Sequence, residues 1–439
     1  MNVAIVGSGP AGLYVAEELA RQRPGVRIDV FDALPTPYGL VRSGVAPDHL
    51  STKNVTRAFD RTFDREHVRF LGNVTLGTDV SYDELKAAYD VVVLSIGANI
   101  DRRLGIPGEH LEQVYGAAAF VGWYNGHPDC RNVIASLEGK ALAVLGNGNV
   151  ALDIVRIVAK TADELSESDI SRHAAAVLER STITDLYLIG RRGPVEASFT
   201  STELAELGEL GRCDIIVDPS QLPDGIGPHI GEKEIKAKER NVEILRDYAK
   251  RELGTKPVRI HFLFCAAPQA VIGEDRVRGL LLERTRIVER GRAELTGERF
   301  ELPVDVVVTA IGYHTKPPTG VPFDETRGVI ANDEGFVEPG VYVAGWSKHG
   351  PKGVIGTNRT DAKQLVGRIV SDFDRSPDRV TKPGGDSIDA LLRERKVRVV
   401  DFDAWRRIAR AEQARARNGK PSEKFTDVAE MLDAAFMGN

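Results

Sequence analysis

The stretch VAIVGSGPAGLYVAEELARQR, residues 3–23, decides the fold. Its first four residues form a continuous apolar strand, and the residues after the glycines have the spacing of an amphipathic helix. Between strand and helix lies the pattern G-x-G-x-x-G. Gly7 permits a tight turn, Gly9 lets the backbone approach a pyrophosphate, and Gly12 lets the helix pack closely on the strand. The start of the helix is therefore suited to bind phosphates.

The residues that follow this helix complete the pattern. A second apolar strand, VRIDVFDA (26–33), ends at Asp32, twenty residues past Gly12. A carboxylate at this place accepts hydrogen bonds from a ribose diol. The glycine pattern alone also occurs in ordinary turns, but strand, turn, helix, strand and acid in this order predict a dinucleotide-binding fold.

A second copy of the pattern occurs in KALAVLGNGNVALDIVRIVAK, residues 140–160. The strand 141–145 leads into Gly146 and Gly148, and Ala151 stands where the first copy has its third glycine. A long amphipathic helix follows, so the sequence predicts a second dinucleotide turn. The next strand is delayed by a charged, helix-like insertion at 160–184.

That delayed strand ends in LYLIGRRGPVEASF (186–199), with Arg191 and Arg192 at the position equivalent to Asp32. An acid there would repel the 2'-phosphate of NADP, whereas arginine guanidinium groups can bind one. The pair therefore favours NADP over NAD. A solvated arginine pair on a loop is the alternative, and the preceding GNGNVA turn favours the phosphate interpretation.

Two similar strands bracket the second fold: YDVVVLSIGAN (89–99) and VDVVVTAIGYH (304–314). We therefore predict an α/β protein with two Rossmann-like dinucleotide-binding domains, the second inserted into the first. The expected FAD-type domain comprises residues 1–102 and 312–439, and the NADP-type domain residues 103–311. The second part of the FAD-type domain should end in a helical extension, because Ile388 to Phe436 has helical apolar spacing.

Composition excludes several classes of function. The chain has 439 residues and a net charge of -6, which gives no basic surface for nucleic acid. Its three cysteines, Cys130, Cys213 and Cys265, form no C-x-x-C pair, so thiol redox chemistry and metal clusters lack their ligands. No apolar run is long enough to span a membrane, and the first strand leaves no room for a signal segment. A cytoplasmic enzyme with bound cofactors, and no metal, is expected.

Four segments in this order resemble the adrenodoxin reductase family of ferredoxin-NADP reductases, and the similarity covers nearly the whole chain. They are TPYGLVRSGVAPDH (36–49), GNGNVALDIVRI (146–157), GRRGPVEASFTSTELAEL (190–207) and VYVAGWSKHGPKGVIGTNRTDA (341–362). The resemblance implies FAD on the first fold and NADPH on the inserted one. It also implies hydride transfer to the flavin, then single-electron transfer to a [2Fe-2S] ferredoxin, or the reverse.

The resemblance also implies roles for individual residues. For FAD these residues are Gly7, Gly9, Ala11, Gly12, Asp32, Leu40, Trp346, Gly353, Val354 and Ile355. For NADP they are Arg102, Asn147, Gly148, Asn149, Val150, Arg191, Arg192 and Glu203. His49 and Glu203 match the family's polar pair near the nicotinamide and are the candidate catalytic residues. From the sequence alone, His49 is also interpretable as a turn residue and Glu203 as an exposed helix residue.

Two other functions are compatible with the same folds. One is the NADPH-dependent electron-input subunit of an amidotransferase, although that type usually carries cysteine-rich cluster motifs before its FAD strand. The other is a redox sensor that binds both nucleotides without turnover.

Overall fold

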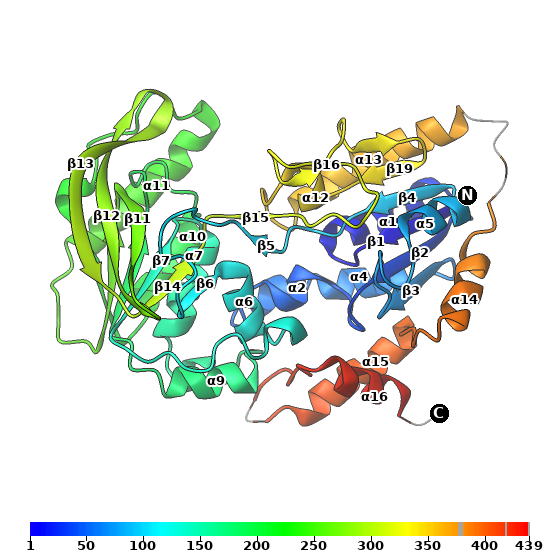
Figure 1. The fold of residues 1–439 in the computed structure, drawn as a ribbon, viewed down its shortest axis with the longest axis horizontal. Coiled ribbons are helices and arrows are strands. Elements are labelled where there is room, and N and C mark those ends of the chain that lie inside the picture. The colour runs from blue at the N-terminus through cyan, green and yellow to red at the C-terminus, as the bar shows by residue number, and fades with distance from the viewer. Residues whose placement is uncertain (376–379, 381, 418, 438–439) are drawn as a thin grey trace. The chain divides into compact units, whose positions relative to one another are not determined.

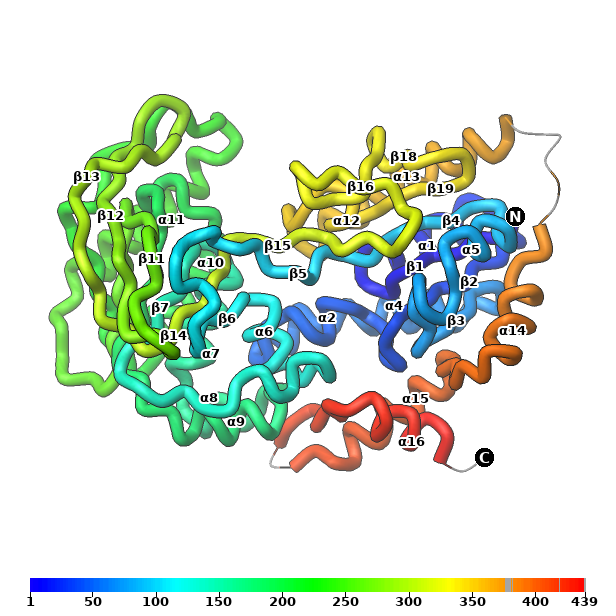
Figure 2. Tube along the Cα trace, in the orientation of Figure 1, coloured from blue at the N-terminus to red at the C-terminus, as the bar shows by residue number. Residues whose placement is uncertain are grey.

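The computed structural model describes residues 1–375, 380, 382–417 and 419–437, which form two compact units. Unit 1 comprises Met1–Ile100, Asn125–Arg131 and Tyr313–Asn439, and unit 2 comprises Asp101–Tyr124 and Asn132–Gly312. The course of the chain through both units can be followed in Figure 2. The segment Asn125–Arg131 belongs to unit 1 although unit 2 residues flank it on both sides, which the sequence analysis did not predict.

Unit 1 is built on a six-stranded sheet with the strand order β18-β19-β4-β1-β2-β3 (Figure 2). The strands are β1 (Asn2–Val6), β2 (Arg27–Asp32), β3 (Val68–Gly72), β4 (Val91–Leu94), β18 (Phe336–Glu338) and β19 (Val341–Val343). All neighbours pair in parallel except β18 and β19. The late strand β19 pairs with β4, so residues from the two ends of the chain complete one sheet.

Both faces of this sheet are covered, as the continuous apolar run of β1 predicts. Val3 and Ile5 face one buried cluster, which includes Leu13 of helix α1 (Pro10–Gln22), and Ala4 and Val6 face another. The other helices of the unit are α2 (Leu40–Ser43), α3 (Leu50–Lys53), α4 (Thr56–Phe63), α5 (Tyr82–Ala88), α12 (Trp346–His349), α13 (Thr357–Asp374), α14 (Gly385–Glu394), α15 (Phe402–Arg415) and α16 (Val428–Phe436).

The three last helices, α14 to α16, form the helical extension that the apolar spacing predicted (orange to red in Figure 1). Val400, Trp405 and Met431 from this extension lie in the same buried cluster as Val3 and Leu13. The extension is therefore part of the core of unit 1. Short strands β16 (Phe323–Asp324) and β17 (Val329–Ile330) pair as a small hairpin.

Unit 2 contains a six-stranded parallel sheet with the order β6-β14-β7-β8-β10-β9. Its strands are β6 (Val114–Gly116), β7 (Ala141–Leu145), β8 (Asp185–Ile189), β9 (Cys213–Val217), β10 (Val258–Leu263) and β14 (Val306–Thr309). A separate antiparallel sheet consists of β11 (Ala266–Gly273), β12 (Val277–Val288) and β13 (Arg292–Pro303).

The helices that follow the strands of unit 2 are α6 (Ala117–Asn125), α7 (Asn149–Ala159), α8 (Ala162–Leu165), α9 (Arg172–Glu179), α10 (Ser201–Glu206) and α11 (Glu232–Ala249). Helices α8 and α9 account for the insertion at 160–184. Where the chain leaves and re-enters unit 1, β5 (Ile100–Asp101) and β15 (Tyr313–His314) form a two-stranded sheet. Among the described helices, none is long and apolar enough to cross a membrane.

Candidate functional site

The first glycine turn of unit 1 accepts only glycine at two of its three positions. Gly7 has a φ of 106°, and a Cβ atom there would lie 2.3 Å from the carbonyl oxygen of Ser95. A Cβ atom on Gly12 would lie 2.2 Å from the carbonyl oxygen of Gly7. Both collisions are with backbone atoms, which cannot rotate away. The tight turn and the close approach of helix to strand expected from the sequence are thus present.

Gly9 is different, because a Cβ atom there would meet only the Cα atom of Gly39, at 4.0 Å. Gly9 is the N-cap of α1, and no side chain caps this helix. The next residues are Pro10, which has no N–H group, and Ala11, whose Cβ lies 2.5 Å from the place a Cβ atom on Gly345 would take. The uncapped helix start and the open space at Gly9 fit a pyrophosphate, as FAD would supply.

Asp32 lies at the end of β2, and its carboxylate contacts the glycine turn. It accepts hydrogen bonds from the backbone N–H of Ser8 (3.0 Å), the hydroxyl of Ser8 (2.5 Å) and the backbone N–H of Leu34 (3.0 Å). Burial raises the pKa of Asp32, and these hydrogen bonds act in the opposite direction. A carboxylate has about four lone-pair sites, so one remains for a ribose hydroxyl. The ribose contact of Asp32 stays a prediction.

Leu40 begins α2 directly beside the glycine turn. Its N-cap, Gly39, has a φ of 48°, and a Cβ atom on Gly39 would lie 3.1 Å from the Cα atom of Gly9. The side chain of Leu40 is 39% exposed, which is unusual for a residue between two buried ones, Tyr38 and Val41. The backbone at 38–40 therefore crosses the turn where FAD is expected. His49 lies further along, half-buried, as the N-cap of α3.

The remaining candidate FAD residues lie around α12. The indole N–H of Trp346 donates to the carbonyl of Lys352 (3.2 Å), and its ring stacks on Tyr313, with 6.1 Å between centroids. The loop that follows is turned by Gly353, whose φ is 82°, and leads through Val354 and Ile355 to Gly356, the uncapped start of α13. Val354 is 61% exposed. Tyr313 was not predicted, because its sequence position gives no sign of the stacking.

The second glycine turn lies in unit 2. Gly146 has a φ of 145°, and a Cβ atom there would lie 2.2 Å from the carbonyl oxygen of Ala310. Gly148 is the N-cap of α7, again without a side-chain cap, and Asn149 accepts a hydrogen bond from the N–H of Thr200 (2.8 Å). The side-chain oxygen of Asn147 is buried without a partner. Asn147, Gly148, Asn149 and Val150 thus surround an uncapped helix start with an unsatisfied polar atom, which fits a dinucleotide pyrophosphate.

Arg191 and Arg192 follow β8 at the same end of the sheet, and both side chains are exposed. Their carbonyls accept hydrogen bonds from the Thr285 hydroxyl (2.7 Å) and the Cys265 N–H (3.1 Å), which fixes the backbone of the pair. Within the described residues neither guanidinium group forms an ion pair. Two unneutralised guanidinium groups on a fixed backbone suit a phosphate.

Lys238 adds to this positive charge and was missed by the sequence analysis. It comes from α11 and donates to the carbonyl of Ala197 (2.5 Å). Burial lowers its pKa, and the nearby charge of Arg192 acts in the same direction. No sequence signal marks it, since Lys238 is one of several lysines on a charged helix. Arg102 is exposed, and its N–H donates to the carbonyl of Gly312 (3.0 Å), just after β14.

Glu203, in α10, is bound to an arginine that the sequence analysis also missed. Arg156 of α7 is only 2% exposed and forms ion pairs with Asp153 (2.7 Å), Glu206 (3.1 Å) and Glu203 (3.5 Å). The charge in the apolar run IVRIV was the available signal. Glu203 is therefore not the freely exposed helix residue of the alternative interpretation. Glu203 and His49 belong to different units.

Replacing Arg156 with methionine is expected to destabilise unit 2 by about 3–5 kcal/mol, because three carboxylates would lose their buried cation. Urea unfolding followed by circular dichroism measures this change. The matched control is Arg180→Met, since Arg180 is an exposed arginine at the end of α9. Equal stability of the Arg156 and Arg180 variants would contradict the assignment of a buried charge cluster.

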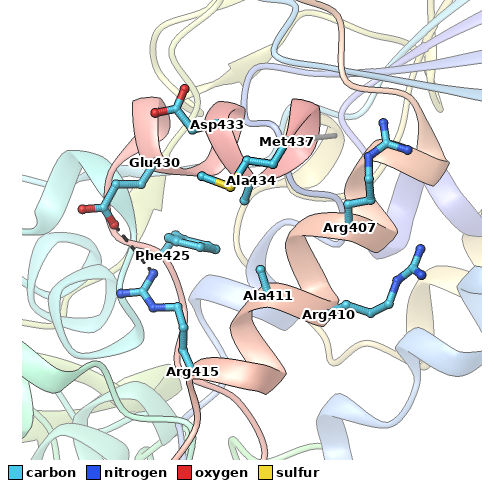
Figure 3. A pocket seen from close by; sticks show the side chains of 9 residues that line it. All are labelled: Arg407, Arg410, Ala411, Arg415, Phe425, Glu430, Asp433, Ala434 and Met437. Carbon is cyan, nitrogen blue, oxygen red and sulfur yellow. Dashed lines mark ion pairs between the residues drawn. The ribbon is translucent and has the colours of Figure 1, made fainter. Parts of the chain in front are cut away.

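A groove of 580 Å³ lies between α15 and α16 (Figure 3). Arg415 and Glu430 form an ion pair across it (3.7 Å), and the guanidinium group of Arg415 lies 4.1 Å from the ring centroid of Phe425. The other lining residues are Arg407, Arg410, Ala411, Asp433, Ala434 and Met437. The groove carries charges of both signs and includes none of the candidate cofactor residues.

Comparisons with known proteins agree with the two dinucleotide turns. Residues 1–183 match the model of the family described as pyridine nucleotide-disulphide oxidoreductase. The chain is 40% identical to the mitochondrial NADPH:adrenodoxin oxidoreductase of Arabidopsis thaliana, over 99% of this chain and 95% of that protein. It is 38% identical to NADPH-ferredoxin reductase FprA of Mycobacterium tuberculosis, over 98% of each. The solved structure of that FprA with NADPH superposes with a TM-score of 0.94, covering 99% of each chain at 38% identity.

Proposed function

The chain belongs to the family of NADPH-dependent adrenodoxin and ferredoxin reductases, and from this premise we propose that it passes electrons from NADPH to an iron-sulfur ferredoxin. It is a flavoprotein oxidoreductase that uses FAD and NADP(H). The observation that carries the proposal is the full-length similarity to NADPH-ferredoxin reductases, joined to two uncapped glycine turns in separate units. A cytoplasmic location is also part of the proposal, and the similarity to a bacterial NADPH-ferredoxin reductase supports it.

In unit 1, the open turn at Gly9 and the start of α1 bind the pyrophosphate of FAD. The carboxylate of Asp32 accepts a hydrogen bond from a ribose hydroxyl. Trp346 and the loop Gly353–Ile355 line the flavin ring. FAD, when bound, supplies a ring that takes up two electrons together and releases them one at a time. Leu40 contacts the cofactor through its backbone, because its neighbour Gly39 lies against Gly9 of the first glycine turn.

In unit 2, the start of α7 at Gly148 receives the pyrophosphate of NADPH, with Asn147, Asn149 and Val150 around it. Arg191 and Arg192 bind the 2'-phosphate, and Arg102 makes a further contact with the nucleotide. Glu203, whose carboxylate is held by Arg156, and His49 are the proposed polar groups at the nicotinamide.

An anaerobic titration with NADPH tests the proposal. The purified protein is expected to be yellow, and about one NADPH per FAD should bleach the flavin absorbance. Addition of a [2Fe-2S] ferredoxin should then start NADPH-dependent reduction of cytochrome c. Bleaching without transfer to any ferredoxin would favour the redox sensor, and a protein that cannot be reconstituted with FAD would contradict the whole proposal.

A further inference from the structure

The helical extension of unit 1, helices α14 to α16, contacts the backbone segment 38–40, which crosses the first glycine turn. Tyr38 precedes Gly39, is 5% exposed, and donates its hydroxyl hydrogen to the carboxylate of Asp60. The indole N–H of Trp405, in α15, donates to the same hydroxyl (3.3 Å), and the two rings pack edge to face. Helix α15 therefore fixes the side chain of Tyr38, the first residue of the segment 38–40.

A buried ion pair holds the other end of this segment. Arg42, in α2, forms two hydrogen bonds with the carboxylate of Glu412 in α15, at 3.0 and 2.5 Å. Glu412 is 2% exposed and also accepts from the N–H of Phe425, in the stretch that leads to α16. The guanidinium group of Arg42 lies over the ring of Trp405, 5.2 Å from its centroid.

Lys424, between α15 and α16, connects α2 to the segment that begins at Asn125. Its buried ammonium group donates to the carbonyl of Arg42 (3.0 Å) and to the carbonyl of Asn125 (3.2 Å). Asn125 begins the short segment that unit 1 takes from the middle of the chain. One cation of the extension therefore ties this segment to the backbone of α2.

A small cavity lies beside these contacts. It is lined by Leu34, whose N–H donates to Asp32, by residues of the segments 36–43 and 125–128, and by Met431 of α16. Two polar atoms are buried near it without a partner: the hydroxyl of Thr36 and the side-chain nitrogen of Asn125. The cavity has a volume of about 10 Å³, which is room for no more than one water molecule, and such a water would complete the hydrogen bonding of these atoms.

We propose that α15 and α16 are a positioning element for FAD, acting through Glu412, Trp405 and Lys424 on the segments 36–43 and 125–128. A buried ion pair contributes little net stability compared with apolar residues, but here the two hydrogen bonds between Arg42 and Glu412 hold α2 against α15. The elements joined here are backbone segments beside the expected pyrophosphate site. The inference rests on the proposed binding of FAD by unit 1.

The test uses the full-length protein, stripped of FAD and titrated with it while flavin fluorescence is recorded. Glu412→Gln is expected to raise the FAD dissociation constant by about tenfold to hundredfold, because the binding segments lose their preorganisation. Trp405→Phe, which keeps an aromatic ring but loses the indole N–H and the second ring, should raise it by a smaller factor and serves if Glu412→Gln does not fold. The control on the same helix is Arg410→Gln, in the groove between α15 and α16, which should bind FAD like the wild type.

Two further measurements separate positioning from general stability. The visible circular dichroism of bound flavin should change in Glu412→Gln, while binding of 2',5'-ADP, a probe of unit 2, should stay at the wild-type value. A variant that melts at a lower temperature but keeps the wild-type FAD affinity and flavin spectrum would overturn the inference. Failure of the wild type itself to bind FAD would instead overturn the proposed function.

Discussion

Replacement of both Arg191 and Arg192 with glutamine is expected to lower kcat/KM for NADPH by about hundredfold, roughly tenfold for each charge-assisted hydrogen bond lost. The guanidinium groups are exposed and have no carboxylate partner within the described residues. Their removal therefore takes away binding without unbalancing a buried charge. Because the 2'-phosphate is remote from the transferred hydride, KM should rise much more than kcat falls.

The same experiment contains its own control, since NADH lacks the 2'-phosphate and its kcat/KM should stay nearly unchanged. Arg180→Gln, an exposed arginine elsewhere in unit 2, should affect neither nucleotide. The wild type should prefer NADPH by about tenfold to a thousandfold. Equal efficiency with both nucleotides in the wild type would mean that the arginine pair is a solvated surface feature.

The second large effect is expected at the first glycine turn, where two alanine substitutions should fail for different reasons. Gly12→Ala places a Cβ atom 2.2 Å from a backbone carbonyl, so strand and helix must separate and unit 1 should not reach its native state. Gly9→Ala meets no protein atom closer than 4.0 Å, so the apoprotein should fold normally. Its methyl group occupies the space reserved for the pyrophosphate, and FAD affinity should fall by about hundredfold or more.

Far-UV circular dichroism of the apoproteins and FAD titration distinguish the two cases. Gly367→Ala is the matched control, because Gly367 lies within α13 and a Cβ atom there meets nothing within 4 Å. It should be neutral or slightly stabilising, since alanine is the better helix former. Normal FAD binding by Gly9→Ala would contradict the placement of the pyrophosphate at this turn.

The sequence predicted the features that depend on neighbouring residues. Strand, glycine turn and helix lie within about twenty residues of one another, so periodicity and spacing are enough to find both folds. The arginine pair was found in the same way, from its place at the end of a strand. The family resemblance then supplied candidates such as Trp346 and Glu203, which no local pattern distinguishes from ordinary helix residues.

The residues that the sequence did not reveal act through partners far away in the chain. Arg42 and Glu412 are 370 positions apart, and Arg156 and Glu203 are 47 apart. Each side chain alone is typical of a solvated helix face, and only the fold shows that it is buried and paired. The segment Asn125–Arg131 of unit 1 is a similar case, because Asn125 contacts Lys424, which lies 299 positions away in the chain.

The interleaving of the two units along the chain has a consequence for synthesis on the ribosome. All six parallel strands of unit 2 have been made once Thr309 has been added, and that unit can fold while translation continues. Strand β4 must wait for its neighbour β19, about 250 residues later, and the contacts of Lys424 come later still. The nascent N-terminal segment therefore stays incomplete until these later residues have been made, and FAD is expected to be captured only after the segment around Lys424 has emerged from the ribosome.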